Sequence, residues 1–290
     1  MEKKSIFKRK FKLYWPLIKS LQTALLLVTG ITGYVSARCP VTTWKTFAGL
    51  TISLFLTVSG STILNMWYDR DIDAKMDRTK HRPLPLGTLN PNEALILGVI
   101  VSTIGVGIAL SMSFIFGVVV FAGLFIDVVI YTIWLKRKTA WSIVWGGISG
   151  GMPILAGRAL GTGEIDFIGI LFAIAILLWI PTHILTFSIK YFEDYKKANV
   201  PTFPSTYGTY KTRVIIAISS LGAAIAIAIV AYGIGLSWGY MRLFAVLTVG
   251  IVGLAAFSVF KPSENVNFGL FKYASLYMLG SMIMVMVGAS

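Results

Sequence analysis

Residues 93–134, EALILGVIVSTIGVGIALSMSFIFGVVVFAGLFIDVVIYTIW, decide the fold of this chain. The charged side chains in this stretch are Glu93 at its start and Asp127 deep inside it. A helix needs about 20 apolar residues to cross a hydrocarbon layer of about 30 Å, so the stretch is long enough to cross a bilayer twice. The runs are apolar on every side rather than alternating, which favours helices over the strands of a membrane β-barrel.

The rest of the chain has the same character. Of its 290 residues, 56% are hydrophobic and 13% are charged, against about 25% charged in a soluble domain. This composition excludes a soluble globule and a disordered chain. We predict an all-α, multi-pass transmembrane bundle that forms one domain over residues 1–290, with a basic segment at 1–16. The nine predicted spans are 17–37, 46–65, 93–113, 115–134, 140–160, 167–189, 213–235, 241–260 and 270–288.

The basic residues predict the orientation of these spans. The formal net charge is +14, and 22 of the 26 Lys and Arg residues fall in five polar stretches on one side of the predicted bundle. Cytoplasmic loops carry the excess of Lys and Arg, so we expect a cytoplasmic N-terminus and an external C-terminus in a cell membrane. Charges scattered over loop ends favour anionic lipid headgroups over nucleic acid as their surroundings. The five stretches are 1–19, 66–92, 135–139, 190–213 and 261–272.

Cysteine and histidine are too scarce to build a metal site. Cys39 is the only cysteine, and His81 and His183 are the only histidines. No intramolecular disulfide or thiolate cluster can form, so a divalent ion would need oxygen ligands. Magnesium is therefore the metal to expect. The first apolar run is longer than the 7–15 residues of a signal-peptide core, which favours a span over a cleaved leader.

The acidic residues gather in two patches within the basic stretches. In the first, Asn65, Asp69, Asp73 and Asp77 recur every four residues, a spacing that keeps them on one face of a helix, with Asp71 on the other side. Converging carboxylates and an amide oxygen suit Mg²⁺, which is usually held by one or two carboxylates together with substrate phosphates. The alternative is a solvated helix end whose acids pair with neighbouring cations.

The second patch is the adjacent pair Glu193 and Asp194. Helical spacing places Asp194 on one face with Lys190, His183 and Trp179. His183 is either an interhelical hydrogen-bonding residue or a contact to a substrate below the metal site. Asp127, inside a span, is either a paired structural acid or a pocket residue. Cations near both patches can bind diphosphate, although each also fits the charge bias of a cytoplasmic loop.

Together these segments resemble the UbiA-type intramembrane prenyltransferase superfamily. Asn65-Met-Trp-Tyr-Asp69-Arg-Asp71-Ile-Asp73 through Asp77 is similar to its first aspartate-rich motif. Trp179-Ile-Pro181-Thr-His183 and Asp194-Tyr195 resemble the branch of protoheme IX farnesyltransferases. The resemblance covers about residues 60 to 213. It departs at Tyr191 and Tyr195, which stand where the superfamily commonly has two Asp, and near the N-terminus at Ile18-Lys19-Ser20.

The resemblance implies transfer of a farnesyl group from farnesyl diphosphate to a vinyl group of haem b, with Mg²⁺ as cofactor. It assigns Asp69, Asp73 and Asp194 as catalytic, and Trp179 and His183 as candidate haem contacts. It further implies the bilayer as surroundings and handover of the product to a haem A synthase or a terminal oxidase assembly. Its metal ligands are Asn65, Asp69, Asp73, Asp194 and Glu193, and its diphosphate-binding cations are Arg78, Arg82, Lys138 and Lys190.

Two alternatives stay open at this point. The same chemistry can act on a quinone precursor or a glycerol-phosphate lipid instead of haem. The chain can also be a multi-pass transporter, although transporters favour inverted repeats and broken helices at mid-membrane, whereas the acids here lie at one interface.

Overall fold

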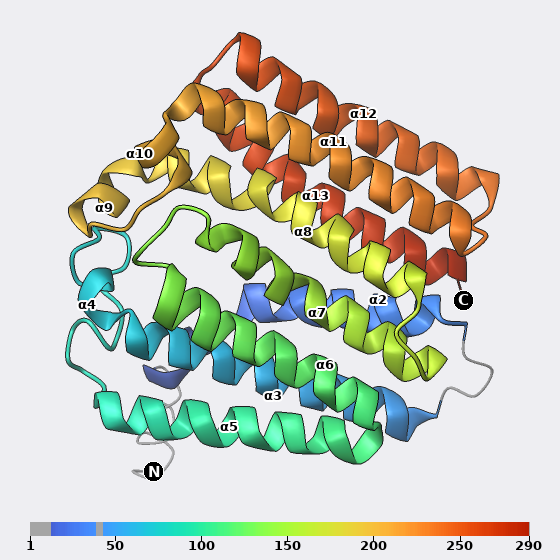
Figure 1. Ribbon diagram of the computed structural model, residues 1–290, viewed down its shortest axis with the longest axis horizontal. Coiled ribbons are helices and arrows are strands. Elements are labelled where there is room, and N and C mark those ends of the chain that lie inside the picture. Colours follow the sequence, from blue (N-terminus) through green and yellow to red (C-terminus); the bar gives the residue numbers. More distant parts are fainter. Residues whose placement is uncertain (1–12, 39–42, 290) are drawn as a thin grey trace, which may run out of the picture.

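The computed structural model describes residues 13–38 and 43–289, and within these ranges the regular secondary structure is entirely helical (Figure 1). Most of the predicted basic segment 1–16 and the lone Cys39 lie outside the described residues. The predicted all-α class is confirmed.

Nine long helical segments run across the molecule, each within a few residues of a predicted span. The largest difference is at the last helix, which begins at Glu264 rather than at residue 270. The segments are η1 (Trp15–Ile18) with α2 (Ser20–Ser36), α3 (Trp44–Tyr68), α5 (Pro91–Met112), α6 (Phe114–Phe125) with the π-helix η2 (Ile126–Leu135), α7 (Ser142–Thr162), α8 (Phe167–Lys190), α11 (Thr209–Gly233), α12 (Trp238–Phe260) and α13 (Glu264–Ala289).

Ser113 separates the two helices of the stretch that decides the fold. Its extended backbone, φ −159° and ψ 136°, ends α5 and begins α6. This single extended residue reverses the direction of the chain, and the two helices then pack against each other. The long apolar run is therefore two antiparallel helices, as predicted.

Eight of the nine segments in the described chain are long and apolar enough to cross a membrane, and α7 falls short of the required hydropathy. Its glycines explain the difference. A Cβ at Gly157 would lie 1.9 Å from the carbonyl oxygen of Gly30 in α2, and one at Gly151 would lie 2.8 Å from that of Ala173 in α8. Small residues let neighbouring backbones approach closely inside a membrane bundle. The low hydropathy of α7 thus reflects close packing between α2 and α8.

The two largest apolar clusters of the described chain form most of its core. One joins residues of α8, α11, α12 and α13, and the other joins residues of α2, α3, α5, α6 and α7. Contacts of α7 with α8 and of α2 with α13 connect the two halves. The short helices α4 (Arg70–Asp73), α9 (Phe192–Lys197) and α10 (Phe203–Tyr207) gather at one end of the bundle. The described chain starts at this end and finishes at the opposite one (Figure 1).

Candidate functional site

The first aspartate patch lies at the end of the bundle where α4 sits. Helix α3 ends at Tyr68, but the hydrogen-bond ladder continues, with Asp69 N–H donating to Asn65 O at 2.9 Å and Asp73 N–H to Asp69 O at 2.8 Å. Asn65, Asp69 and Asp73 therefore stay on one inward face, with 9%, 2% and 6% of their surfaces exposed. Asp71 is exposed on the other side, as the spacing predicts.

The shared face does not extend to Asp77. Helix α4 ends at Asp73, and Asp77 lies in the following turn with an exposed side chain. It accepts hydrogen bonds from Lys197 at 2.6 Å and Lys80 at 2.7 Å. These two bonds lower the pKa of the Asp77 carboxyl to about 2. The spacing rule fails here because the helix it assumes has ended.

The π-helix η2 supplies the partners of Asn65 and Asp69. Asn65 Nδ2 donates to Thr132 Oγ1 at 2.9 Å, and one turn further the Lys136 ammonium pairs with the Asp69 carboxylate. Burial alone would lower the pKa of the Lys136 ammonium, but the neighbouring Asp69 carboxylate outweighs burial and raises it. A π-helix closes i→i+5 hydrogen bonds, and here Lys136 N–H donates to Tyr131 O at 2.8 Å. This wider turn aligns Thr132 and Lys136 with the polar face of α3.

Arg137 connects the exposed and buried aspartates. Its guanidinium binds Asp71 through two hydrogen bonds of 2.7 Å and lies 3.8 Å from Asp69 Oδ1. It also donates to Tyr68 O at 2.9 Å. The bond from Arg137 lowers the pKa of the Asp71 carboxyl. Asp71 therefore positions a cation of the site from outside.

Asp73 faces the loop between α4 and α5. Arg82 Nη1 donates to Asp73 Oδ2 at 2.7 Å, and Thr79 Oγ1 donates to Asp73 O at 2.9 Å. Arg82, one of the predicted diphosphate-binding cations, is thus held beside the carboxylates.

Arg78 occupies a box of aromatic rings from α8 and α9. Its guanidinium carbon lies 5.0 Å from the ring centre of Phe187, 5.6 Å from that of Tyr191 and 5.3 Å from that of Tyr195. One terminal nitrogen donates to the Tyr195 hydroxyl at 3.3 Å, while the buried Nε has no hydrogen-bond partner. The two tyrosines that stand in place of the usual second-motif aspartates thus hold an arginine.

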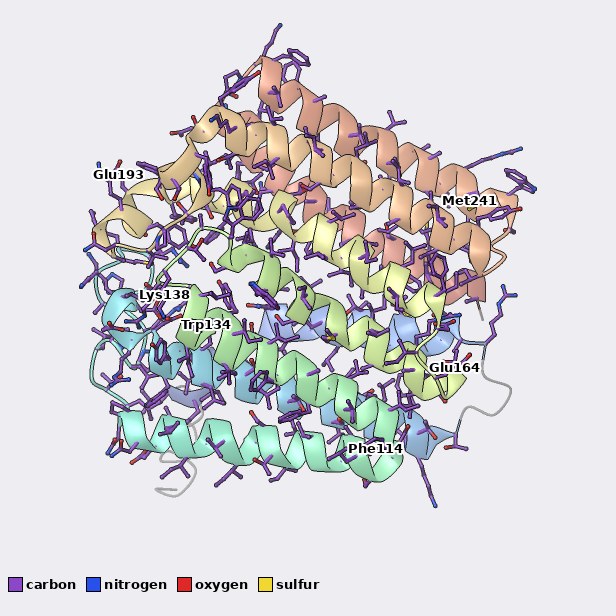
Figure 2. All side chains as sticks on the ribbon, viewed as in Figure 1. Phe114, Trp134, Lys138, Glu164, Glu193 and Met241 are labelled. Carbon is purple, nitrogen blue, oxygen red and sulfur yellow. The ribbon has the colours of Figure 1, made fainter. Side chains whose placement is uncertain are left out.

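Asp194 lies close to the first patch but uses its carboxylate on the backbone. Its two oxygens accept from the N–H groups of Asp77 at 3.2 Å and Arg78 at 3.3 Å. Glu193 is exposed at the outer edge of the same end (Figure 2). Within residues 13–38 and 43–289, no three acidic, histidine or cysteine side chains converge as a metal site. The five predicted metal ligands are therefore not gathered around one point, and their ligand role stays a prediction.

Two predicted cations lie apart from the carboxylates. Lys138 is exposed at the polar end (Figure 2). The ammonium of Lys190 lies 4.0 Å from the ring centre of Phe268 and 5.5 Å from that of Tyr191. The pairing cations Lys136 and Arg137 are sequence neighbours of Lys138 that the spacing argument did not select. An apolar sequence gives no sign of π-helical turns, so Lys136 and Arg137 can be recognised as partners of the aspartates only in the folded structure.

His183 lies deeper along α8, between two aromatic rings. Its ring centre is 4.5 Å from that of Phe271 and 5.2 Å from that of Trp179, and Nδ1 lies 3.3 Å from Ser275 Oγ. Trp179 Nε1 donates to Ala274 O of α13 at 2.8 Å. The contact of His183 with Ser275 fits an interhelical hydrogen bond. The contact of His183 with a substrate stays a prediction.

Asp127 has hydrogen-bonding neighbours on two helices. Ser61 of α3 donates to one carboxylate oxygen, and Ser149 of α7 donates to the other at 3.4 Å. This arrangement matches the paired structural acid among the two interpretations of this residue.

Fold and site together define a multi-pass membrane protein with an ionic site at one end of its bundle, a class suited to substrates with an anionic head and an apolar tail. A family model described as the UbiA prenyltransferase family matches residues 26–276. The chain belongs to the UbiA prenyltransferase family, and it is a prenyltransferase rather than a transporter.

Three relatives of the chain carry the same name. It is 45% identical over 199 residues to a protoheme IX farnesyltransferase of Archaeoglobus fulgidus, covering 69% of this chain and 70% of the relative. A protoheme IX farnesyltransferase of Pyrobaculum neutrophilum is 35% identical, over 90% and 94% of the two chains. One of Desulforudis audaxviator is 32% identical, over 97% and 89%.

Solved structures confirm the fold. A structure described as digeranylgeranylglyceryl phosphate synthase superposes with a TM-score of 0.80 at 20% identity, over 97% of this chain and 99% of the other. A UbiA homologue of Archaeoglobus fulgidus bound to GPP and Mg²⁺ gives 0.71 at 17% identity, over 94% and 99%. At these identities the likeness concerns the arrangement of the helices alone.

Proposed function

We propose that this prenyltransferase transfers a farnesyl group from farnesyl diphosphate to a vinyl group of haem b, in a Mg²⁺-dependent reaction at the cytoplasmic face of the cell membrane. The observation that carries the proposal is the pair of buried carboxylates, Asp69 and Asp73, set among cations from two other segments. The names of the relatives support haem as the acceptor.

The residues present fit a divalent cation. Asp69 Oδ1 is buried and has no hydrogen-bond partner, and a buried charged oxygen without a partner is costly. Asn65 uses its Nδ2 group toward Thr132, so its amide oxygen is available as a further ligand. Asn65, Asp69 and Asp73 would hold the ion. When bound, it would act as a Lewis acid that neutralises diphosphate charge.

The cations of the site stabilise the leaving group. The allylic carbon–oxygen bond breaks, and its electron pair stays with the diphosphate. Arg78, Arg82, Lys136 and Arg137 are fixed beside this position by carboxylates and aromatic rings before the reaction begins. Preorganised charges of this kind are worth more than mobile ones because they need no reorganisation as charge develops. Lys138 and Lys190, which the sequence also predicts as partners of the diphosphate, lie outside this set of fixed cations.

The bundle then controls what the allylic cation meets. The terminal carbon of a haem vinyl group supplies the electron pair for the new carbon–carbon bond. Water adds to the resulting cation at the inner vinyl carbon and loses a proton, which gives a hydroxyethylfarnesyl group. A site walled by helices limits earlier capture of the allylic cation by bulk water. Trp179 and His183 are the proposed acceptor contacts. The product would pass to a haem A synthase or a terminal oxidase assembly.

The test is direct. Membranes that contain the protein are incubated with haem b, farnesyl diphosphate and Mg²⁺, and the extracted haems are measured by mass spectrometry. We expect a farnesylated, hydrated haem that disappears with EDTA and returns when Mg²⁺ is restored. A product formed on a quinone precursor but not on haem would reject the proposed acceptor, and activity in metal-free buffer would reject the metal.

A further inference from the structure

A cleft opens where α8 ends and α13 begins, and Tyr191 is among the residues that line it. It is lined by charged, polar and aromatic side chains from both helices. The lining side chains that matter here are Phe187, Lys190, Tyr191, Asn267, Phe268 and Phe271.

Two ammonium groups lie against Phe268, one of the rings that line this cleft. Lys190 Nζ lies 4.0 Å and Lys272 Nζ 4.5 Å from the ring centre of Phe268. Neither lysine forms an ion pair with an acidic side chain of the described residues. Like charges that share one ring repel each other, so an anion bound between them is favoured.

Asn267 supplies an independent sign of a ligand. It is 4% exposed and lines the cleft, and its Nδ2 donates to Thr186 O at 2.8 Å. Its Oδ1 is buried with no hydrogen-bond partner. Buried polar atoms normally have a partner, and a hydrated or protonated carboxyl group would supply the missing donor. The lysines suit a carboxylate, and the amide oxygen of Asn267 suits the O–H group of a protonated carboxyl or of its bound water. Together these groups suit a carboxyl ligand.

Aromatic rings continue from the cleft into the bundle. Phe271 lines the cleft and stacks at 25° on His183, which stacks at 21° on Trp179. Trp179 and Ser275 line a second cleft among α2, α8 and α13. A flat aromatic ligand with acidic side chains on one edge could place that edge at the lysines and its ring system along this row.

We infer that the α8–α13 cleft binds the carboxylate side chains of the acceptor, which for haem b are its two propionates. This inference rests on the proposed function and moves Lys190 from the diphosphate to the acceptor. Arg78 stays with the diphosphate, since its guanidinium is held among the rings of Phe187, Tyr191 and Tyr195 and it does not line the cleft.

The test compares haem b with its dimethyl ester, in which both carboxylates are blocked. Binding of each to purified protein is followed by Soret absorption without prenyl substrate, for the wild type, Lys190→Gln and Lys272→Gln. We expect the wild type to prefer the free acid, and each variant to bind haem b about fivefold more weakly, as for the loss of a partly exposed ion pair. Binding of the ester should not change. Lys261→Gln is the control, because this exposed cation lies beside Phe257, at the same end but outside the cleft.

Other outcomes would overturn the inference. If Lys190→Gln raises the KM for farnesyl diphosphate and keeps the acid preference, the lysine belongs to the diphosphate. If the loss occurs only in bilayers with anionic lipid and not in phosphatidylcholine, the cleft holds a lipid headgroup. If the wild type makes no farnesylated haem, the proposed function fails and this assignment fails with it. If product formation is normal and both variants still prefer haem b over its dimethyl ester as the wild type does, the cleft assignment is rejected and the proposed function stands.

Discussion

Asp69 and Asp73 differ from Asp71 in burial, and we expect them to differ in function. Asp69→Asn and Asp73→Asn should each lower kcat/KM by about 100-fold or more, because each removes a charge fixed inside the site. Asp71→Asn should act more weakly, because it only loosens the hold on Arg137. Farnesyl transfer with purified variants measures all three.

The three variants control for one another, since each replaces a carboxylate by a carboxamide of nearly the same size. Membrane insertion and thermal unfolding should be close to wild type for Asp71→Asn. Equal loss of activity in all three would contradict the inward face of Asn65, Asp69 and Asp73 and would point to a segment wrapped around its ligand.

Lys136 and Lys138 offer a second comparison. Lys136→Gln should reduce transfer by about 100-fold and lower stability, because it leaves the buried Asp69 charge without its partner. Lys138→Gln, at an exposed position, should keep activity within about threefold. Single-turnover rates separate the chemical step from substrate binding. A larger loss of activity in Lys138→Gln would support the role of Lys138 as a diphosphate-binding cation, as the sequence predicts.

Sequence reasoning succeeded at single residues where an ordinary helix carries the pattern. The four-residue spacing of Asn65, Asp69 and Asp73 survives because hydrogen bonds continue across the junction of α3 and α4. It failed at Asp77, where the helix has ended. Asp194 was selected as a ligand by charge and position, but the contact of its carboxylate with two backbone N–H groups depends on a loop more than 100 residues away in the chain.

At the scale of elements, the π-helix η2 is the feature that sequence could not reveal. Residues 126–135 have the composition of an ordinary apolar span. Asp127 and Thr132 within it, and Lys136 directly after it, form polar contacts with other helices. Their spacing of five and four fits i→i+5 turns, but an apolar background gives no independent signal of such turns. Long spans are predictable from hydropathy, whereas their local pitch depends on packing.

The contact between α2 and α7 gives an element-scale prediction. Gly157→Ala should lower the free energy of unfolding by at least about 1–3 kcal/mol, because the new methyl group would meet the backbone oxygen of Gly30. Gly253→Ala in α12 is the control, since no other atom lies within 4 Å of its Cβ position. Thermal unfolding in detergent compares the two. Equal stability would contradict the close approach of α2 and α7.

An ion pair at the opposite end of the bundle gives a pH-dependent prediction. Arg158 of α7 donates to both oxygens of Asp166, which begins α8, at 2.6–2.9 Å. Burial alone would raise the pKa of the Asp166 carboxyl, but the hydrogen bonds from Arg158 outweigh burial and lower it. A lowered pKa stabilises the fold above the ordinary value of 3.8, and this contribution is lost as pH falls below it.

Asp166→Asn should therefore destabilise the protein by about 3 kcal/mol near pH 6. The difference in Tm between wild type and variant should shrink as the pH is lowered from 6 to 3, because the wild-type carboxylate then takes up a proton. A difference that stays constant over this range would show that the charge of Asp166 does not contribute to stability.

At the scale of the whole molecule, hydropathy was sufficient to predict the class of fold and the positions of the long helices. Nine long helices follow the nine predicted spans, and the departure of α7 from the hydropathy of the others is explained by its glycine contacts. The way in which α8 and α13 meet to form a cleft was not predictable, because apolar spans with no narrow polar face can pack in many orders. The site depends on that order more than on any one motif.

The orientation of the bundle is the last prediction. The loops around α4, α9 and α10 share one end of the molecule, and Lys138 and Glu193 lie there, while Glu164 and Met241 lie toward the other end (Figure 2). The basic stretches 66–92, 135–139 and 190–213 belong to the first end. Because Lys and Arg in short loops favour the cytoplasmic side, this end should face the cytoplasm.

A reporter inserted beside the exposed His81 should therefore be cytoplasmic, and one fused after residue 290 should be external. Alkaline phosphatase and a fluorescent protein, which are active on opposite sides of the membrane, measure both positions. Reversed signals would mean that the charge bias does not set the orientation. Signals on the same side would contradict the odd number of crossings, and α7, with its lower hydropathy, would then be the helix that does not cross the bilayer.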